Sequence, residues 1–218
     1  MKYPGMYIYP PRPSTETKFK SQLYERLKQS GWIAQVKANG QRSVEYFHPD
    51  GKLMMWNRHK AHHRNYTLPS WLDTELRAAI KIKPDTWEII DSELLHAKDA
   101  TVKNTFYLYD LLVHEGEYLT GTSYQQRHKL LMDIAGASEA NLVDGWRYQV
   151  SEHIWVARNL PPEMWDDTWG LTSTSWIEGF VLKNPVGRLL PGITPSNNGD
   201  WMIRCRKLSN SGHVGRYG

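Results

Sequence analysis

The feature that most constrains this 218-residue sequence is a set of predicted strands that carry charged side chains within apolar segments. Within residues 32–43 (WIAQVKANGQRS), apolar and polar residues alternate up to Lys37, which predicts a strand that ends near this lysine. Residues 176–183 (WIEGFVLK) form another such strand, which carries Glu178 and Lys183. Charges on buried faces are costly unless they are paired or bound to a ligand. The pattern therefore predicts that these strands converge on one shared site.

The stretch around Lys37 has a chemistry of its own. A lysine at the end of a buried strand is easily converted to a neutral, nucleophilic amine. Gly40 would let the backbone turn closely around a ligand. Arg42 supplies a fixed positive fork that suits phosphates or sugar hydroxyls. Taken alone, this stretch could equally be a surface hairpin, so the rest of the chain must decide.

The composition predicts a soluble globular protein, with 40% hydrophobic and 23% charged residues. The net charge of +4 is compatible with a polyanionic partner but does not demonstrate one. Cys205 is the only cysteine, so an intramolecular disulfide is impossible and a reducing cytoplasm is the expected location. No apolar run approaches the length of about 20 residues that crosses a bilayer. We expect a monomer with no membrane association.

Periodicity and turn signals predict an alternation of helices and strands in one domain over residues 1–207, followed by a flexible tail over 208–218. Ser14 or Thr15 would cap the first helix. The expected elements are an extended arm over 1–15, helices over 17–30, 70–82 and 123–134, a hairpin over 43–56, strands over 87–95, 105–112, 148–150, 176–183 and 201–207, and a short helix near 153–158.

A basic, histidine-rich loop is expected between the hairpin and the second helix. It contains Arg58, Lys60 and Arg64 among several histidines. Zinc binding is one interpretation, but the spacing of the histidines fits no standard ligand set. A solvated loop that lies near phosphate is the favoured interpretation.

Five motifs in a fixed order resemble those of the covalent nucleotidyltransferase superfamily, which comprises ATP-dependent DNA ligases, RNA ligases and mRNA capping enzymes. VKANGQR resembles the first motif, KxDGxR, and IIDSELL resembles the third, usually DGE. TFYLYDLL and the following YQQRHKLL resemble the aromatic–Asp motif and its later arginine, EGFVLK matches EGxVxK, and WMIRCRK resembles the tryptophan followed by K-x-K. The matches run from about residue 30 to residue 207.

The resemblance implies an α+β adenylation domain, with two antiparallel sheets flanked by helices in an ATP-grasp-like arrangement around a nucleotide cleft. It also implies that Lys37 attacks the α-phosphate of ATP and forms a lysyl–AMP phosphoramidate. Glu178, together with Glu93, would hold Mg²⁺ or Mn²⁺. By the same resemblance, nucleotide contacts fall to Gln35 and Val36 at the base, Tyr109 stacking on adenine, Arg42 and Glu93 at the ribose, and Lys183, Arg204 and Arg206 at the phosphates.

The chain departs from the family pattern at several positions. Asn39 replaces the usual aspartate after the nucleophile, and Ser92 replaces the usual glycine before Glu93. The two arginines at Arg204 and Arg206 replace lysines, with a spacing from the tryptophan that is one residue longer, so Lys207 is an alternative phosphate ligand.

The sequence ends eleven residues after Lys207, which leaves no room for the OB-fold domain that DNA ligases and capping enzymes normally carry. We expect either a minimal enzyme or a catalytic domain cut from a longer one.

Among the members of this superfamily, a DNA nick-sealing ligase of compact, virus-like size fits best, acting in the cytoplasm on a nicked duplex. Arg42 favours it, as does the Asn57-Arg58 segment, which resembles the Ser-Arg segment whose arginine touches the nicked duplex. Arg58, Lys60 and Arg64 are the expected nucleic-acid contacts. An RNA ligase is the first alternative, and a non-catalytic nucleic-acid-binding module of the same fold is the second.

Overall fold

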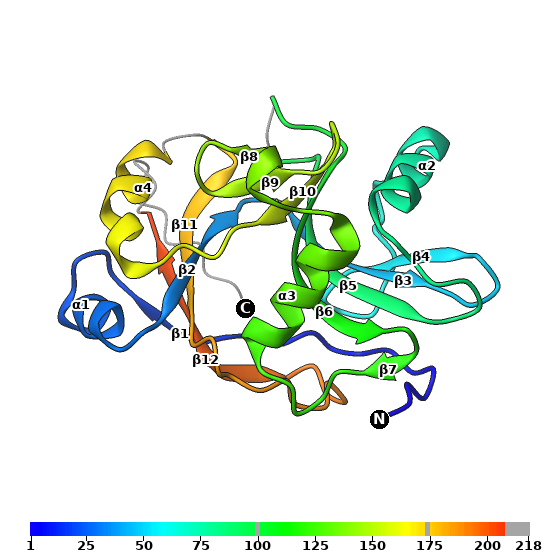
Figure 1. Ribbon diagram of the computed structural model, residues 1–218, viewed down its shortest axis with the longest axis horizontal. Coiled ribbons are helices and arrows are strands. Elements are labelled where there is room, and N and C mark those ends of the chain that lie inside the picture. The colour runs from blue at the N-terminus through cyan, green and yellow to red at the C-terminus, as the bar shows by residue number, and fades with distance from the viewer. Residues whose placement is uncertain (99–100, 173–174, 208–218) are drawn as a thin grey trace.

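The computed structural model describes residues 1–98, 101–172 and 175–207, which form two β-sheets with helices on their outer sides (Figure 1). The smaller sheet has the strand order β1 (Arg12–Thr17), β12 (Asn198–Arg206), β11 (Ile177–Lys183) and β2 (Ile33–Ala38). The larger sheet has the order β4 (Leu53–Trp56), β3 (Gln41–Phe47), β5 (Glu88–Leu95), β6 (Thr105–His114), β10 (Ile154–Ala157), β9 (Arg147–Gln149) and β8 (Leu142–Val143), with β7 (Glu117–Tyr118) paired to β6.

The expected α+β class is confirmed, although neither sheet is purely antiparallel. In the smaller sheet, β1 pairs with β12 in parallel. In the larger sheet, β10 pairs with β6 in parallel. Both parallel pairs join segments that are distant in the sequence, because a parallel pair needs a long crossover connection. The described residues form no closed barrel.

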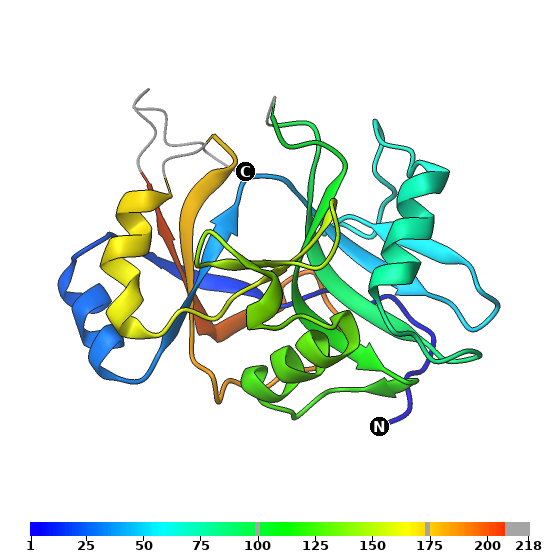
Figure 2. The same ribbon diagram turned by 45° about the horizontal axis from the view of Figure 1, so that its top comes forward.

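Helices cover the outer sides of both sheets, as Figures 1 and 2 show. Tyr24 and Leu27 of the first helix pack into one core cluster beneath the smaller sheet, together with Trp165 of the last helix. The second and third helices send residues such as Leu72 and Leu131 into a separate cluster on the larger sheet. The helices are α1 (Gln22–Gln29), α2 (Ser70–Ala79), α3 (Tyr124–Ala135) and α4 (Trp165–Leu171), with 3₁₀ turns η1 (Glu139–Asn141) and η2 (Pro162–Met164).

The N-terminal arm is extended, as predicted, and it connects the two sheets. The Tyr3 amide donates to a carbonyl beside β7 at 2.8 Å, and the Ile8 amide donates to the Tyr46 hydroxyl of β3 at 2.7 Å. The arm then becomes β1, which runs to Thr17. Because that strand occupies the expected start of the helix, α1 begins later, and Ser21 caps it by accepting from the Tyr24 amide. The predicted cap at Ser14 or Thr15 is therefore wrong.

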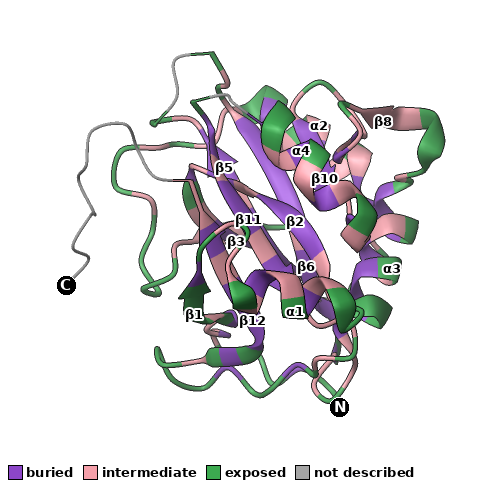
Figure 3. Cartoon of the chain, turned by 90° about the vertical axis from the view of Figure 1, so that its left-hand side faces the viewer, coloured by how far each residue is buried: buried purple, intermediate pink, exposed green. Residues whose placement is uncertain are grey.

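The short helix predicted near residues 153–158 is also wrong, because residues 154–157 form strand β10. All four of its residues are buried, and the strand lies between β6 and β9. A short apolar run that is buried on both faces suits the interior of a sheet, and periodicity alone cannot distinguish it from a helix. Figure 3 shows the same burial for the central strands of both sheets.

The remaining predicted helices and strands occur close to their expected positions. The predicted flexible tail over 208–218 lies outside the described residues. Among the described residues, no helix is both long enough and apolar enough to span a membrane.

Candidate active site

A cavity of about 1830 Å³ opens between the two sheets, and residues of both sheets line it. Its volume exceeds the roughly 300–1,000 Å³ of typical small-molecule sites, which leaves room for a nucleotide and part of a second substrate. The structure brings every predicted site residue to this cavity except Lys60, namely Gln35, Val36, Lys37, Arg42, Arg58, Arg64, Glu93, Tyr109, Glu178, Lys183, Arg204 and Arg206.

Lys37 lies near the end of β2, opposite Gly179 of the antiparallel strand β11. Its ammonium forms an ion pair with Glu178, with Nζ 2.5 Å from Oε2. Both side chains are about one quarter exposed to solvent, at 24% and 27%. Lys37 is thus accessible from the cavity, and a carboxylate lies in direct contact with its nitrogen.

Glu178 and Lys183 both line the cavity, although residues five apart point to opposite faces of a flat strand. A register shift between β11 and β2 at Gly179 resolves this difference. Gly179 has a φ of +130°, and a β-carbon there would lie 2.2 Å from the Cys205 carbonyl oxygen. Only glycine fits this irregularity, and the irregularity brings the two charged residues to one face.

Gly40 follows β2 and packs directly against β5. Its amide donates to Glu93 Oε1 at 3.1 Å, and an added β-carbon would lie 2.5 Å from the Leu94 carbonyl oxygen. The close approach that requires glycine is therefore to β5, whereas the sequence predicted a close approach to a ligand. Burial raises the pKa of the Glu93 carboxyl.

Arg42 is held by groups that the sequence analysis did not identify. Its Nε donates to Asp91 Oδ1 at 2.8 Å, its Nη2 also contacts Asp91, and Nη2 donates to the Pro11 carbonyl at 2.7 Å. The guanidinium carbon lies 5.7 Å from the centre of the Tyr109 ring. Asp91 belongs to the same IIDSELL segment as Glu93. The strand register places Glu93 opposite Arg42 and Asp91 opposite Val44, so the Arg42 guanidinium reaches Asp91 diagonally across the strand pair.

Lys183 lies at the buried end of the cavity, beside Gln35. Its Nζ donates to Gln35 Oε1 at 2.6 Å, and Gln35 Nε2 donates to Asn159 Oδ1 at 3.0 Å. The Lys183 ammonium also lies 4.1 Å from the centre of the Tyr124 ring. Burial lowers the pKa of Lys183 to about 7. The resemblance assigned Lys183 to the phosphates and Gln35 to the base, but the structure places these two side chains in direct contact.

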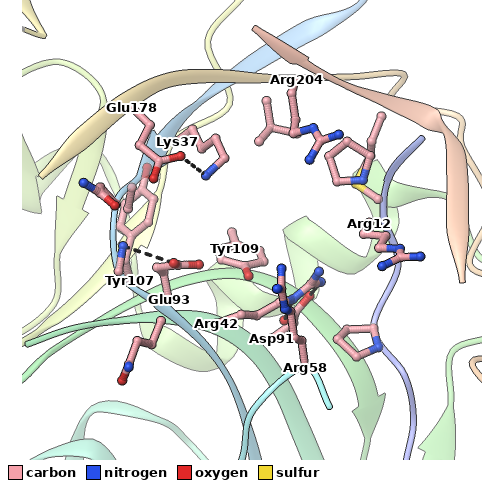
Figure 4. A pocket seen from close by; sticks show the side chains of 18 of the residues that line it. Arg12, Lys37, Arg42, Arg58, Asp91, Glu93, Tyr107, Tyr109, Glu178 and Arg204 are labelled. Carbon is pink, nitrogen blue, oxygen red and sulfur yellow. Dashed lines mark hydrogen bonds and ion pairs between the residues drawn. The ribbon is translucent and has the colours of Figure 1, made fainter. Parts of the chain in front are cut away.

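Two tyrosines from β6 line the cavity. The Tyr109 hydroxyl donates to the Ser92 carbonyl at 3.0 Å, and the Lys183 ammonium lies 5.4 Å from its ring centre. Tyr107, which the sequence analysis missed, lies opposite Glu93 in the β5–β6 pairing and beside it in Figure 4. The Tyr107 hydroxyl is buried without a hydrogen-bond partner among the described residues. Its spacing of two from Tyr109 on a strand was the signal that both share a face.

The three cations at the end of β12 differ in their contacts. Arg206 forms a double contact with Glu16, with distances of 2.8 and 2.6 Å. Lys207 donates to the carbonyls of Trp169 and Thr172 at 2.7 and 2.5 Å. Arg204 points into the cavity in Figure 4, and its Nε is buried with no partner among the described residues. A buried donor without a partner, on a half-buried cation, is what an anionic ligand would satisfy.

The basic loop lies at the mouth of the cavity. Arg58 and Arg64 line the cavity and are exposed, whereas Lys60 is exposed but does not line it. The loop is anchored from both sides, because the Tyr7 hydroxyl donates to the Asn57 carbonyl at 2.8 Å and His63 lies 3.2 Å from the Ser43 hydroxyl.

The aromatic–Asp motif and its later arginine meet in the core of the larger sheet. Arg127 of α3 contacts Asp110 of β6 twice, at 2.9 and 3.0 Å, and both side chains are almost fully buried. This pair fixes α3 on β6 rather than contributing a group to the reaction.

The carboxylates available for a metal ion are Glu178 and Glu93, which face the same part of the cavity as Lys37 (Figure 4). The described residues hold no cluster of three or more acidic, histidine or cysteine ligands. Mg²⁺ is usually bound by one or two carboxylates together with substrate phosphates and water, so this donor set fits it.

Comparison with known proteins gives structural matches alone. No known family profile matches the sequence, and no curated protein does. A mycobacterial DNA ligase D solved with ATP and MES has a TM-score of 0.59 and 18% sequence identity, and the match covers 92% of this chain and 62% of that one. The ligase domain of LigD from M. tuberculosis has a TM-score of 0.56 and 19% identity, with coverage of 89% and 60%. A Lig E DNA ligase, described as binding DNA with a minimal scaffold, has a TM-score of 0.52 and 14% identity, with coverage of 90% and 69%.

This chain spans about three fifths of the length of the two LigD structures. The match nevertheless includes nearly all of the present chain, and thus both sheets and the cavity between them. The chain has the fold of the catalytic domains of ATP-dependent DNA ligases.

Proposed function

We propose that this protein is an ATP-dependent polynucleotide ligase that seals 5′-phosphate/3′-hydroxyl nicks in DNA through a lysyl–AMP intermediate. The observation that carries the proposal is the position of Lys37. It lies in a large cavity between the sheets, beside Glu178, with cations and aromatic rings on the surrounding walls. A nucleophilic amine, phosphate-binding cations and a base-binding surface are the groups that nucleotidyl transfer to a lysine requires.

In the first step, the lone pair of Lys37 Nζ forms a bond to the α-phosphorus of ATP. The bond between that phosphorus and the oxygen bridging to the β-phosphate breaks, and pyrophosphate leaves with the electron pair. The ammonium must first lose a proton, and Glu178 Oε2, at 2.5 Å, is positioned to accept it. The ion pair between Lys37 and Glu178 must then open as the nitrogen turns toward phosphorus.

The nucleotide is held by residues that extend from Lys37 to the buried end of the cavity. Tyr107 and Tyr109 present aromatic surface there, and Glu93 is placed to accept from ribose hydroxyls. The hydrogen bond between Lys183 and Gln35 favours a role for both at the edge of the base, in place of the phosphate role that resemblance gives Lys183.

The phosphates are the part of the nucleotide that Arg204 would bind, because this cation points into the cavity with an unmet donor. Glu178 and Glu93 would hold Mg²⁺, which neutralises phosphate charge when it is bound. Arg42 already uses its Nε and Nη2 groups on Asp91 and the Pro11 carbonyl. It would therefore contact the ribose through its remaining group, Nη1.

In the second step, an oxygen of the 5′-phosphate at a nick attacks the phosphorus of lysyl–AMP, and the bond to Lys37 breaks as the amine takes up a proton. In the third step, the 3′-hydroxyl attacks that 5′-phosphate and AMP leaves. Arg58 and Arg64, exposed at the mouth of the cavity, are placed to contact the sugar–phosphate backbone. Binding of a duplex should therefore weaken steeply with added salt.

The test is transfer of label from α-labelled ATP to the protein in the presence of Mg²⁺, followed by denaturation. We expect label on the wild type and none on Lys37→Ala. Lys81→Ala is the matched control, because Lys81 is exposed and lies outside the cavity, and it should retain full labelling. Absence of label from the wild type, or label that survives Lys37→Ala, would refute the mechanism.

RNA ligation is the second candidate function, since the cations and aromatic rings that line the cavity could contact either DNA or RNA. Nicked DNA, a nicked RNA–DNA hybrid and single-stranded RNA, supplied in parallel to the adenylylated protein, separate the two. We expect nicked DNA to be sealed fastest. Sealing of single-stranded RNA at a higher rate would contradict the DNA assignment, while label transfer would still support the ligase chemistry.

A further inference from the structure

Transfer of AMP to Lys37 imposes a direction on the cavity. In phosphoryl transfer, the attacking and leaving atoms lie roughly in line, on opposite sides of the phosphorus. If Lys37 attacks the α-phosphorus, as proposed above, pyrophosphate must depart toward the wall of the cavity that faces Lys37. That wall needs cations, because the leaving group carries a high negative charge.

Arg12 occupies this wall. Figure 4 shows its side chain across the open cavity from Lys37, on the same side as Arg204. The two arginines come from opposite ends of the chain and are brought together because β1 pairs in parallel with β12. Glu16 lies opposite Arg204 in that pairing, and its carboxylate is engaged with Arg206.

The side chain of Arg12 is oriented but not neutralised. Its Nε donates to Asn198 Oδ1 at 2.8 Å, and Asn198 is its direct neighbour across the strand pair. No carboxylate is paired with Arg12 among the described residues. An amide that accepts from Nε fixes the plane of the guanidinium and leaves the Nη edge for another acceptor.

Three other cations that line the cavity are already paired with carboxylates. Lys37 is paired with Glu178 at 2.5 Å, and Arg206 is paired with Glu16 at 2.6 Å. Arg42 is paired with a buried aspartate. A polyphosphate can therefore approach Arg12 without first breaking an ion pair, and arginine presents the forked donors that suit phosphate oxygens.

We infer that Arg12 binds the β- and γ-phosphates of ATP and the departing pyrophosphate, and that Asn198 is a positioning residue for its guanidinium. No sequence signal pointed to this role, because Arg12 lies in a proline-rich arm outside every motif. The inference rests on the proposed function, since it needs Lys37 as the nucleophile.

Reversal of the first step tests the inference. Adenylylated protein, freed of ATP, is mixed with pyrophosphate, and ATP formation is followed as pyrophosphate is varied. An oxygen of pyrophosphate then bonds to the AMP phosphorus while the bond to Lys37 Nζ breaks. Arg12→Gln should raise the half-saturating pyrophosphate concentration about tenfold or more, the loss expected for one charge-assisted contact. Asn198→Ala should raise it by a smaller factor.

Arg26→Gln is the matched control, because Arg26 is an exposed arginine of α1 outside the cavity, and its half-saturating concentration should equal that of the wild type. Arg12 is exposed and β1 pairs through its backbone, so thermal unfolding of Arg12→Gln should match the wild type. A second measurement follows transfer of AMP from the adenylylated variant to a nicked duplex.

An unchanged half-saturating pyrophosphate concentration in Arg12→Gln overturns the inference, whether or not transfer to the nick is slowed. A loss in transfer to the nick without a loss for pyrophosphate would assign Arg12 to the 5′-phosphate instead. If the wild type forms no adenylylated protein, the proposed function fails first, so the two failures are distinguishable.

Discussion

Replacing Arg127 with methionine should lower the free energy of unfolding by about 3–5 kcal/mol. Arg127 is fully buried, and its guanidinium contacts Asp110 at 2.9 and 3.0 Å and the Thr122 carbonyl at 2.8 Å. Methionine fills much of the same volume but leaves the Asp110 carboxylate buried without its cation. The magnitude follows from that uncompensated charge rather than from lost packing.

The same substitution should also weaken ATP binding, because the pair fixes α3 beside the cavity. The hydroxyl of Tyr124, the first residue of α3, donates to the Tyr109 carbonyl at 3.3 Å, and its ring lies under the Lys183 ammonium. A shift of α3 would therefore displace groups at the buried end of the cavity.

Urea unfolding followed by tryptophan fluorescence measures the change. Lys129→Met is the matched control on the same helix, because Lys129 forms an exposed ion pair with Asp133 and its side chain is 75% accessible. The control should lose no more than about 0.5 kcal/mol. The double variant Asp110→Leu/Arg127→Met should be more stable than Arg127→Met alone, since it removes the stranded charge. A loss below about 1 kcal/mol for Arg127→Met would refute this reasoning.

Three further outcomes are expected. Burial lowers the pKa of Lys183 from 10.5 to about 7, so the unfolded chain binds more protons between these values, and urea titrations should show stability rising with pH from 7 to 10 more steeply in the wild type than in Lys183→Met. Gly40→Ala places a β-carbon 2.5 Å from the Leu94 oxygen, so it should cost about 1–3 kcal/mol of stability and weaken ATP binding measured by calorimetry. Arg204→Gln should weaken ATP binding about tenfold, and Arg206→Gln less, since Arg206 is already paired; equal losses would contradict this ranking.

The sequence was sufficient to predict that charged strands converge, because a buried charge needs a partner wherever the strand lies. Lys37, Glu93 and Glu178 all line the cavity between the two sheets. Strand periodicity also predicted most element positions. It could not predict the irregularity at Gly179, because the φ of +130° depends on the backbone of β12 packed against that glycine.

The partners of the charged residues were not predictable for a different reason. Arg206 and Glu16 are 190 residues apart in the sequence and meet only because β1 adds to the edge of β12. Nothing local in the proline-rich arm signals that pairing, so Arg12 was missed. Asp91 and Glu93 both lie in the IIDSELL segment, and the register between β3 and β5 places Glu93 opposite Arg42. The guanidinium nevertheless contacts Asp91, diagonally across the strand pair, and neither the sequence nor the register alone predicts that choice.

The distribution of ion pairs has a consequence for the order of events in the cavity. Lys37 cannot attack phosphorus while Glu178 holds its ammonium at 2.5 Å, and opening that pair without a replacement partner is unfavourable. Arg12 and Arg204 are not tied to carboxylates among the described residues, so phosphates can dock on them without breaking an ion pair. With the phosphates docked, transfer of the Lys37 proton to Glu178 leaves a neutral amine and a neutral carboxyl, and the nitrogen can turn toward phosphorus without separating two charges. Docking of the phosphates on Arg12 and Arg204 should therefore precede the proton transfer that makes Lys37 a nucleophile.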